Sequence, residues 1–156
     1  MGQLTFDLQA HRGGAGLAPE NTIAAFANAL RIGVSTLEYL QRGGRISPTR
    51  RRLGDALGVK PMLTMRDGEV VEHKKVRGMD GLWREFERFL VASAPAEGPV
   101  RIGIAHAQAP EAVERLTELV GRLRPQASID RVCSIGAVVG THGGPGAFGL
   151  LILPDA

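Results

Sequence analysis

The clearest pattern of apolar positions lies between residues 80 and 93. Five large apolar residues in this segment recur at the spacing that places side chains on one face of an α-helix: Leu82, Trp83, Phe86, Phe89 and Leu90. This stripe holds three of the seven aromatic residues of the chain. We expect it to form the core of the fold and not a box for a cofactor.

Four further segments have helical signals. A helix is expected from residue 20 or 21 to residue 32, with Ile23, Phe26, Ala27 and Leu30 on one face and Gly33 as its stop. A short amphipathic piece spans 36–42. A third segment, 47–57, has Pro48 at its first position, and a fourth starts at Pro110 and ends near Arg124.

Period-two or continuous apolar runs predict the strands. Two of them, 59–65 and 69–73, are joined by Arg66-Asp67-Gly68, and Asp-Gly is typical of a hairpin turn. The others are 4–8, 100–105, 129–135 and 147–153, and we expect a glycine-rich loop before the last one. About six strands and five helices in 156 residues predict one compact α+β domain, with helices packed on a mostly antiparallel or mixed sheet.

Glycine is the compositional outlier, with 21 of 156 residues, against a usual share of about 7%. Eleven of them lie in three clusters, within 13–16, 43–44 and 136–149. Glycine permits positive φ and close approach of a ligand to the backbone, so these clusters are where we look for a site. The single cysteine, Cys133, excludes a disulfide framework, and its apolar neighbours predict a buried, inert thiol.

The remaining bulk properties exclude several classes. The sequence contains no run of 18 apolar residues, so a membrane span is not expected. Its first residues lack the basic and apolar regions of a signal peptide, and we therefore expect a cytoplasmic protein. The net charge is +3. Residues 42–52 carry five arginines and no acid, which suits either a solvated helix face or a surface for an acidic partner or phosphate. Aromatic residues do not interleave with them, so nucleic-acid binding is not expected.

The first glycine cluster carries a resemblance. Residues 10–14 (Ala-His-Arg-Gly-Gly) and 18–22 (Ala-Pro-Glu-Asn-Thr) resemble the start of glycerophosphodiester phosphodiesterases, which are TIM barrels. The resemblance covers about 4–34 and implies His11 as general acid or base, with Arg12 and Glu20 beside it. The alternative is a retained loop whose polar groups bond each other.

The chain departs from the phosphodiesterase pattern after this segment. The metal-binding Glu-x-Asp is missing, because Glu38 is followed by Tyr39 and Leu40, so Glu38 is a doubtful metal ligand. No second catalytic histidine follows, and a complete barrel needs at least about 200 residues. A metal-dependent phosphodiesterase therefore stays an alternative function only.

The second and third clusters belong to a longer resemblance. Collinear motifs over 35–153 resemble the C-terminal lobe of DegV-family fatty-acid-binding proteins: 36–46, 59–64, 67–68, 75–78, 104–107 and 135–147. The resemblance implies a carrier that buries one long-chain fatty acid and presents it to a separate fatty acid kinase. It implies no catalysis and no cofactor. The acyl tail would lie among apolar side chains of this lobe.

The same resemblance indicates the ligand-binding residues. The His of the Gly-Thr-His-x-Gly-Pro-Gly loop would hold the carboxylate, together with hydroxyl groups of a missing N-terminal lobe. This assigns ligand contact to Thr141, His142, Gly143, Gly144 and Gly146, and a partner or ligand role near the lobe junction to Arg45. Imidazole, hydroxyl and turned backbone N–H groups are donors that a carboxylate needs. The alternative is a tight structural turn.

Apolar strands supply the other half of such a site. Strand segments 102–104 and 150–152 could line the acyl slot. His73 and His106 have no ligand-spaced partner in the sequence, and we expect surface or hydrogen-bonded core histidines.

The two resemblances meet near residues 33–35. They suggest a phosphodiesterase-like segment 1–34 joined to a DegV-like lobe 35–156, as a natural fusion, a truncation or an engineered chimera. Such a chain would be an incomplete fatty-acid-binding lobe with weak affinity, or a structural chimera without a ligand. The N-terminal segment would then cover apolar surface by packing Ile23, Phe26 and Leu30 on the sheet, or the chain would form a homo-oligomer or domain swap.

Overall fold

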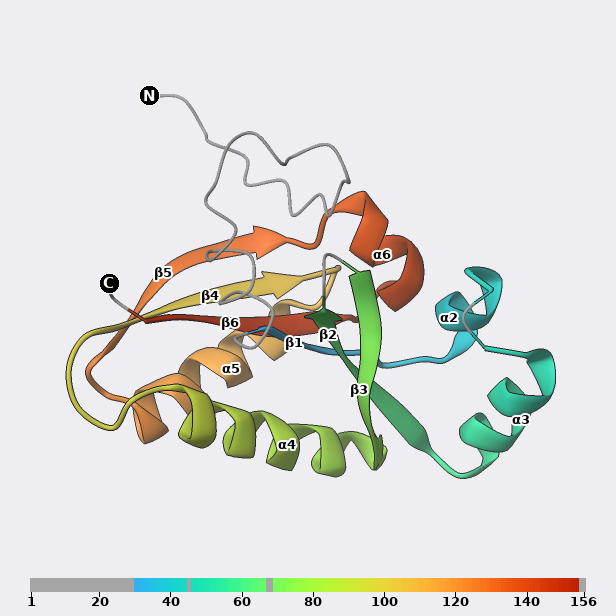
Figure 1. The fold of residues 1–156 in the computed structure, drawn as a ribbon, viewed down its shortest axis with the longest axis horizontal. Helices are drawn as coiled ribbons and strands as arrows, with labels where there is room; N and C mark the ends of the chain where they lie inside the picture. Colours follow the sequence, from blue (N-terminus) through green and yellow to red (C-terminus); the bar gives the residue numbers. More distant parts are fainter. Residues whose placement is uncertain (1–29, 45, 67–68, 155–156) are drawn as a thin grey trace.

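A computed structural model describes residues 30–44, 46–66 and 69–154 of the chain. These residues form one six-stranded sheet with helices on both of its faces (Figure 1). The elements run in the order β1 (Leu30–Gly33), α2 (Glu38–Arg42), α3 (Pro48–Ala56), β2 (Val59–Arg66), β3 (Glu69–Arg77), α4 (Gly78–Ser93), β4 (Val100–His106), α5 (Pro110–Leu123), β5 (Ala127–Ser134), α6 (Ala137–Gly143) and β6 (Phe148–Pro154). The expected α+β class is confirmed.

The sheet is mixed, as expected, and mostly antiparallel. Its strand order is β3-β2-β1-β6-β4-β5. Every neighbouring pair is antiparallel except β4 and β5, which are parallel and are joined through α5. A parallel pair needs such a crossover, whereas the antiparallel β2–β3 pair needs only its short turn.

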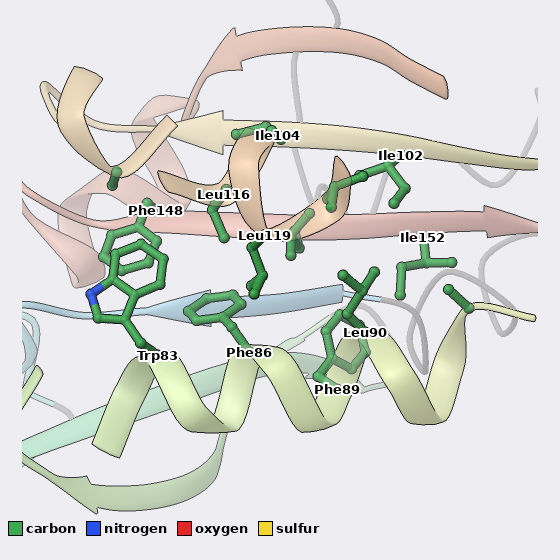
Figure 2. Close-up of a cluster of buried hydrophobic side chains, with 14 of the residues drawn as sticks. Trp83, Phe86, Phe89, Leu90, Ile102, Ile104, Leu116, Leu119, Phe148 and Ile152 are labelled. Atoms are coloured by element: carbon green, nitrogen blue, oxygen red, sulfur yellow. The ribbon is translucent and has the colours of Figure 1, made fainter. Parts of the chain in front are cut away.

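The main core lies between the sheet and helices α4 and α5 (Figure 2). The five residues of the predicted α4 stripe are all buried there, which confirms the periodicity argument. They pack on alternate residues of β4 and β6, including Ile102, Ile104, Phe148 and Ile152. Helix α5 closes the layer with Leu116 and Leu119.

A second apolar cluster lies on the opposite face of the sheet. It consists of Leu30, Ile32, Val34, Leu37, Leu40, Leu63 and Val139. It joins β1 and β2 to α2 and α6, so these two short helices are fixed by tertiary packing. A five-residue helix has little stability of its own.

Residues 30–32 are not helical, so the predicted helix over 20–32 is wrong at this end. They belong to β1, which pairs with β2 on one side and β6 on the other. Leu30 and Ile32 face the second cluster, while Gly33 faces α4, where a Cβ atom would lie 2.8 Å from Leu82 Cδ2. The side chains of this segment therefore alternate between the two faces of the sheet, with the two-residue period of a strand and not the 3.6-residue period of a helix. Ile23, Phe26 and the strand expected at 4–8 lie outside the described residues.

The glycine-rich loop expected before the last strand is also wrong in part. Residues Ala137–Gly143 form the helix α6, with buried Val139 anchoring it to the second cluster. Gly140 is tolerated within it because its backbone N–H still donates to the carbonyl of Gly136 at 2.9 Å. The density of glycine there masked a helix whose stability comes from packing.

The other predicted elements are confirmed within a few residues. Ser47 caps α3, where its Oγ accepts a hydrogen bond from the backbone N–H of Arg50 at 3.3 Å. Strand β3 runs to Arg77, four residues further than expected. Cys133, expected to be buried, is half-buried on edge strand β5, and desolvation raises the pKa of its thiol.

Candidate functional site

The candidate site lies at one end of the sheet, where β1 and β4 end and β6 begins. Gly33 and His106 are the last residues of their strands, and both pair with Phe148, the first residue of β6. The segment after β1 carries α2, and the segment before β6 carries α6. The two helices are in contact, so the second and third glycine clusters meet.

Two glycines of the loop after α6 accept side chains from the segment after β1. Gly144 has a φ of +70°, and a Cβ atom there would lie 2.1 Å from Tyr39 Cδ2. Gly146 has a φ of +82°, and a Cβ atom there would lie 2.7 Å from Ser35 Oγ. The Ser35 hydroxyl donates to the carbonyl of Pro145 at 3.3 Å. Both positions therefore require glycine, because the positive φ disfavours other residues and because a side chain would collide with Tyr39 or Ser35.

The third contact runs in the other direction, from α6 to α2. The imidazole of half-buried His142 lies against Gly43, where a Cβ atom would be 2.5 Å from Nδ1. Because Nδ1 is buried against this backbone, contact with a ligand would fall to Nε2. Gly43 thus sets the position of the ring.

The remaining predicted ligand residues lie on the same helix end. Thr141 is exposed on the last turn of α6, and its hydroxyl donates to the carbonyl of Ala137 at 2.6 Å. Gly143 is buried, and a Cβ atom there would be 3.0 Å from that of Ala147. The geometry brings three of the six predicted residues, His142, Gly144 and Gly146, against Gly43, Tyr39 and Ser35. Thr141 points its proton back into its own helix.

Backbone bonds hold the loop to the end of β4. The N–H of Gly146 donates to the carbonyl of Ala107 at 2.6 Å, and the N–H of Ala107 donates to the carbonyl of Ala147 at 2.8 Å. His106 Nδ1 accepts the N–H of Ala109 at 3.2 Å, which confirms a hydrogen-bonded structural histidine. His73 is exposed on β3, as expected of a surface histidine. The loop is therefore hydrogen-bonded to the end of the sheet through the segment after β4.

Charged groups surround α2. Glu38, the doubtful metal ligand, is engaged by Arg42 at 2.5 Å and by Arg51 at 3.9 Å. Arg51 also donates to Gln41 and Asp55. The arginine-rich stretch is thus partly neutralised by acids at its two sides, while Arg50 and Arg52 are exposed. Arg45 lies outside the described residues.

The strands expected to line an acyl slot have their side chains in the main core. Ile102, Ile104, Leu150 and Ile152 are at most 1% exposed and pack against α4 and α5. Buried Phe148, the first residue of β6, lies between them and the candidate site. In this structure the apolar layer is filled by the protein's own side chains.

Sequence reasoning missed Ser35 and Tyr39. No local pattern marks them, since Ser35 meets Pro145 across 110 positions of the chain. The glycines at 144 and 146 indicated only that some group lies close to the backbone there, and not which group it is. What approaches is a side chain of the same chain.

The phosphodiesterase residues His11, Arg12 and Glu20 lie outside the described residues. Across 30–44, 46–66 and 69–154, no three His, Cys, Asp or Glu side chains are grouped to hold a metal ion. Over the same ranges, no helix combines the length and apolar character needed to cross a membrane.

The comparisons with known proteins agree with this fold. A family model described as an uncharacterised protein of the DegV family matches residues 24–155. A DegV domain-containing protein of Streptomyces coelicolor is 37% identical over 122 residues, 76% of this chain and 42% of that protein. The chain thus spans about two fifths of the length of the curated relatives it matches.

Solved structures give the same result. The fatty-acid-binding DegV family protein of Streptococcus agalactiae is 28% identical, with a TM-score of 0.64, covering 87% of this chain and 48% of that one. The fatty acid kinase B3 protein of Streptococcus pneumoniae, loaded with linoleic acid, is 20% identical with a TM-score of 0.63, covering 83% and 46%, which shows a shared fold.

The family match also bears on the expected junction near residues 33–35. It begins at residue 24, so it takes in residues 24–34 of the segment that resembled a phosphodiesterase. Strand β1, ahead of that junction, is an inner strand of the same sheet. From residue 24 to residue 155, the chain belongs to the DegV family.

Proposed function

We propose that this chain binds a long-chain fatty acid and acts as the acyl-holding lobe of a DegV-like carrier. The observation that carries the proposal is the convergence of Ser35, Tyr39 and Gly43 with His142, Gly144 and Gly146 at one end of the sheet. Relatives with this fold are described as fatty-acid-binding.

The carboxylate would lie beside His142. The imidazole, whose Nδ1 is buried against Gly43, supplies through Nε2 a donor of the kind that a carboxylate prefers. Lys60, whose Nζ donates to the carbonyl of Ser35 at 2.5 Å, adds a positive charge beside Ser35. Thr141 and Arg45 stay candidate contacts for the same carboxylate.

The acyl tail would occupy the layer behind Phe148. This layer already consists of aliphatic side chains from β4 and β6 on one side and from α4 and α5 on the other. A tail placed there is shielded from water along its length, and burial contributes roughly 0.8 kcal/mol per methylene. The cost is the displacement of side chains that now fill the space.

The partner in this proposal is a fatty acid kinase. One structural relative is named as a fatty acid kinase protein and holds linoleic acid. This chain would then be a carrier without catalysis or cofactor, working in the cytoplasm. Because the chain covers less than half of these relatives, further donors to the carboxylate would come from a region with no counterpart in this chain.

Two hypotheses from the sequence remain without support beyond the sequence itself. A phosphodiesterase would rest on His11, Arg12 and Glu20, and its only described candidate residue, Glu38, is engaged by two arginines. A fused or engineered chimera would now have its junction before residue 24, where the family match begins.

Native mass spectrometry of delipidated protein incubated with oleate tests the proposal. We expect one retained acyl chain per protein and a higher melting temperature, since a ligand that binds only the folded state stabilises it. His142→Ala should weaken binding about tenfold or more, as loss of a hydrogen bond to a charged group does. His73→Ala, an exposed histidine on β3, is the matched control. If wild-type protein retains no oleate and its melting temperature is unchanged, the proposal is wrong.

A further inference from the structure

An aromatic cluster closes the core directly beneath the candidate site. Phe148 is 2% exposed and follows the glycine loop without a break. The ring of Trp83 stacks on it with centroids 4.7 Å apart and an interplanar angle of 17°. Phe86 stacks on it from the same helix at 5.2 Å. These three rings lie between the loop and the aliphatic side chains further along the core (Figure 2).

The outer side of Trp83 faces a groove between α4 and α5. This groove has a volume of about 240 Å³ and is lined by Trp83, Glu87, Arg115, Glu118, Leu119 and Arg122. Trp83 and Leu119 also belong to the main core. The indole is therefore the wall between the groove and the layer that holds the aliphatic side chains.

Charged side chains hold this wall in place. The guanidinium of Arg115 lies over the indole at 4.4 Å from the ring centroid, which is a cation–π contact. A second link across the groove joins Arg122 to Glu87. Both links are at the surface, where such contacts are weak and exchange readily. These two surface links can open at little cost, and the remaining resistance to a movement of Trp83 is its ring contacts with Phe86 and Phe148.

We infer that Trp83 and Phe148 are the first apolar side chains that an acyl chain contacts, and that Trp83 makes room for it by turning into the α4–α5 groove. The inference rests on the proposed function. The backbone of Phe148 is held by pairing with both Gly33 and His106, and its ring is enclosed by Trp83 and Phe86. Phe86 has no exposed surface. Trp83 is the ring of the three with open space beside it.

The need to displace Trp83 would also make the site selective for the shape of its ligand. A chain entering at the loop must pass the rings before it reaches Leu150 and Ile152, so the rings favour a flexible saturated or unsaturated tail over a rigid polycyclic one. The hydrophobic contact is non-directional and roughly proportional to the area buried.

Trp83 is the only tryptophan of the chain, so its fluorescence reports on this place alone. Delipidated protein is titrated with stearic acid and with dibrominated stearic acid, and retention of each is measured by native mass spectrometry. We expect the brominated acid to quench most of the Trp83 emission relative to stearic acid at equal occupancy, and stearic acid itself to shift the emission, because the indole leaves its stack on Phe148 for a groove lined by charged side chains. Retention of the brominated acid without quenching would overturn the inference and leave the proposed function standing.

The movement itself is tested by rates. Stopped-flow quenching should show uptake several-fold faster in Arg115→Ala, which lacks the cation over the indole. Arg84→Ala, an exposed arginine on the same helix as Trp83, is the matched control and should match the wild-type rate. Equal rates in all three proteins would show that Trp83 is a fixed wall. If wild-type protein retains neither acid, the proposed function fails and this inference with it.

Discussion

The ring of Tyr39 lies against the backbone of Gly144, in space that any side chain at position 144 would occupy. A Cβ atom there would be 2.1 Å from Cδ2 of the ring. The φ of Gly144 is +70°, a region that other residues avoid. Backbone and packing therefore both select glycine at this position, and they tie α2 to the loop after α6.

Gly144→Ala should lower the free energy of unfolding by more than Gly58→Ala. Both glycines have positive φ, but Gly144 also has a ψ of 178°, which places it in a region that is essentially restricted to glycine, so the backbone contributes to the larger loss at position 144. Only at position 144 does the new Cβ meet a ring, because a Cβ at Gly58 has nothing within 4 Å. Urea denaturation of the two variants measures the difference. Equal losses would show that neither the backbone conformation of Gly144 nor its contact with Tyr39 adds a cost at this position.

Gly43→Ala should weaken oleate binding through His142. The new methyl group would lie 2.5 Å from Nδ1, so the imidazole must move. A double-mutant cycle checks the cause, since two changes that act on one contact are not additive. In a His142→Ala background, Gly43→Ala should have no further effect on oleate affinity.

The control for this variant is Gly121→Ala. Gly121 lies in α5, where a Cβ atom has nothing within 4 Å. Alanine should there stabilise the protein by about 0.5–1 kcal/mol and leave binding unchanged. If Gly43→Ala still weakened binding without the imidazole, the ring would not be the group it displaces.

Local patterns predicted the elements whose stability is local. The α4 stripe has five apolar residues at helical spacing, and all five are buried. Strand β1 was missed because four residues are too few to show a period, and their apolar positions also fit the helical spacing that precedes them. Helix α6 was missed because its glycines suggest a loop, whereas Val139 packing on the second cluster decides the outcome.

In the candidate site, too, the sequence indicated local features but not the contacts between distant segments. The sequence resemblance drew attention to His142 and the glycines, but it showed neither the helix that carries His142 nor the contacts of Gly144 with Tyr39 or of Gly43 with His142. These contacts join segments about a hundred positions apart, and no period in the sequence reports on them. They depend on β1 and β6 being neighbours in the sheet.

Phe86→Ala should cost about 3–5 kcal/mol of unfolding free energy, the range for truncating a buried aromatic residue. Phe86 has no exposed surface and packs on both Trp83 and Phe148. Leu53→Ala on α3 is the comparison, because Leu53 is 61% exposed and should change stability by at most about 0.5 kcal/mol. Thermal and urea unfolding of both variants measure this. A loss below about 1 kcal/mol at Phe86 would contradict a tightly packed core.

Glu85 should make stability depend on pH. Burial by itself would raise the pKa of its carboxyl group, but hydrogen bonds and charges from Lys74 and Arg88 outweigh it, so that pKa lies below its usual value. The two cations lie 2.9 and 3.2 Å from Oε2. A carboxyl group with a lowered pKa in the folded state stabilises the protein above its unfolded-state pKa. That stability is lost as the pH falls through the folded-state pKa.

Glu85→Gln should therefore destabilise the protein at pH 7, by about 1.5–3 kcal/mol for hydrogen bonds to a charged group. The difference from wild type should shrink as the pH falls below about 4, because the wild-type carboxyl is then protonated as well. Glu72→Gln is the matched control, since Glu72 forms an exposed pair with Lys75 at 3.3 Å and should matter little at either pH. Urea denaturation of the three proteins at pH 7 and pH 3.5 measures the effect. A Glu85→Gln penalty that stays constant between these two pH values would mean that the loss comes from packing and not from the charge.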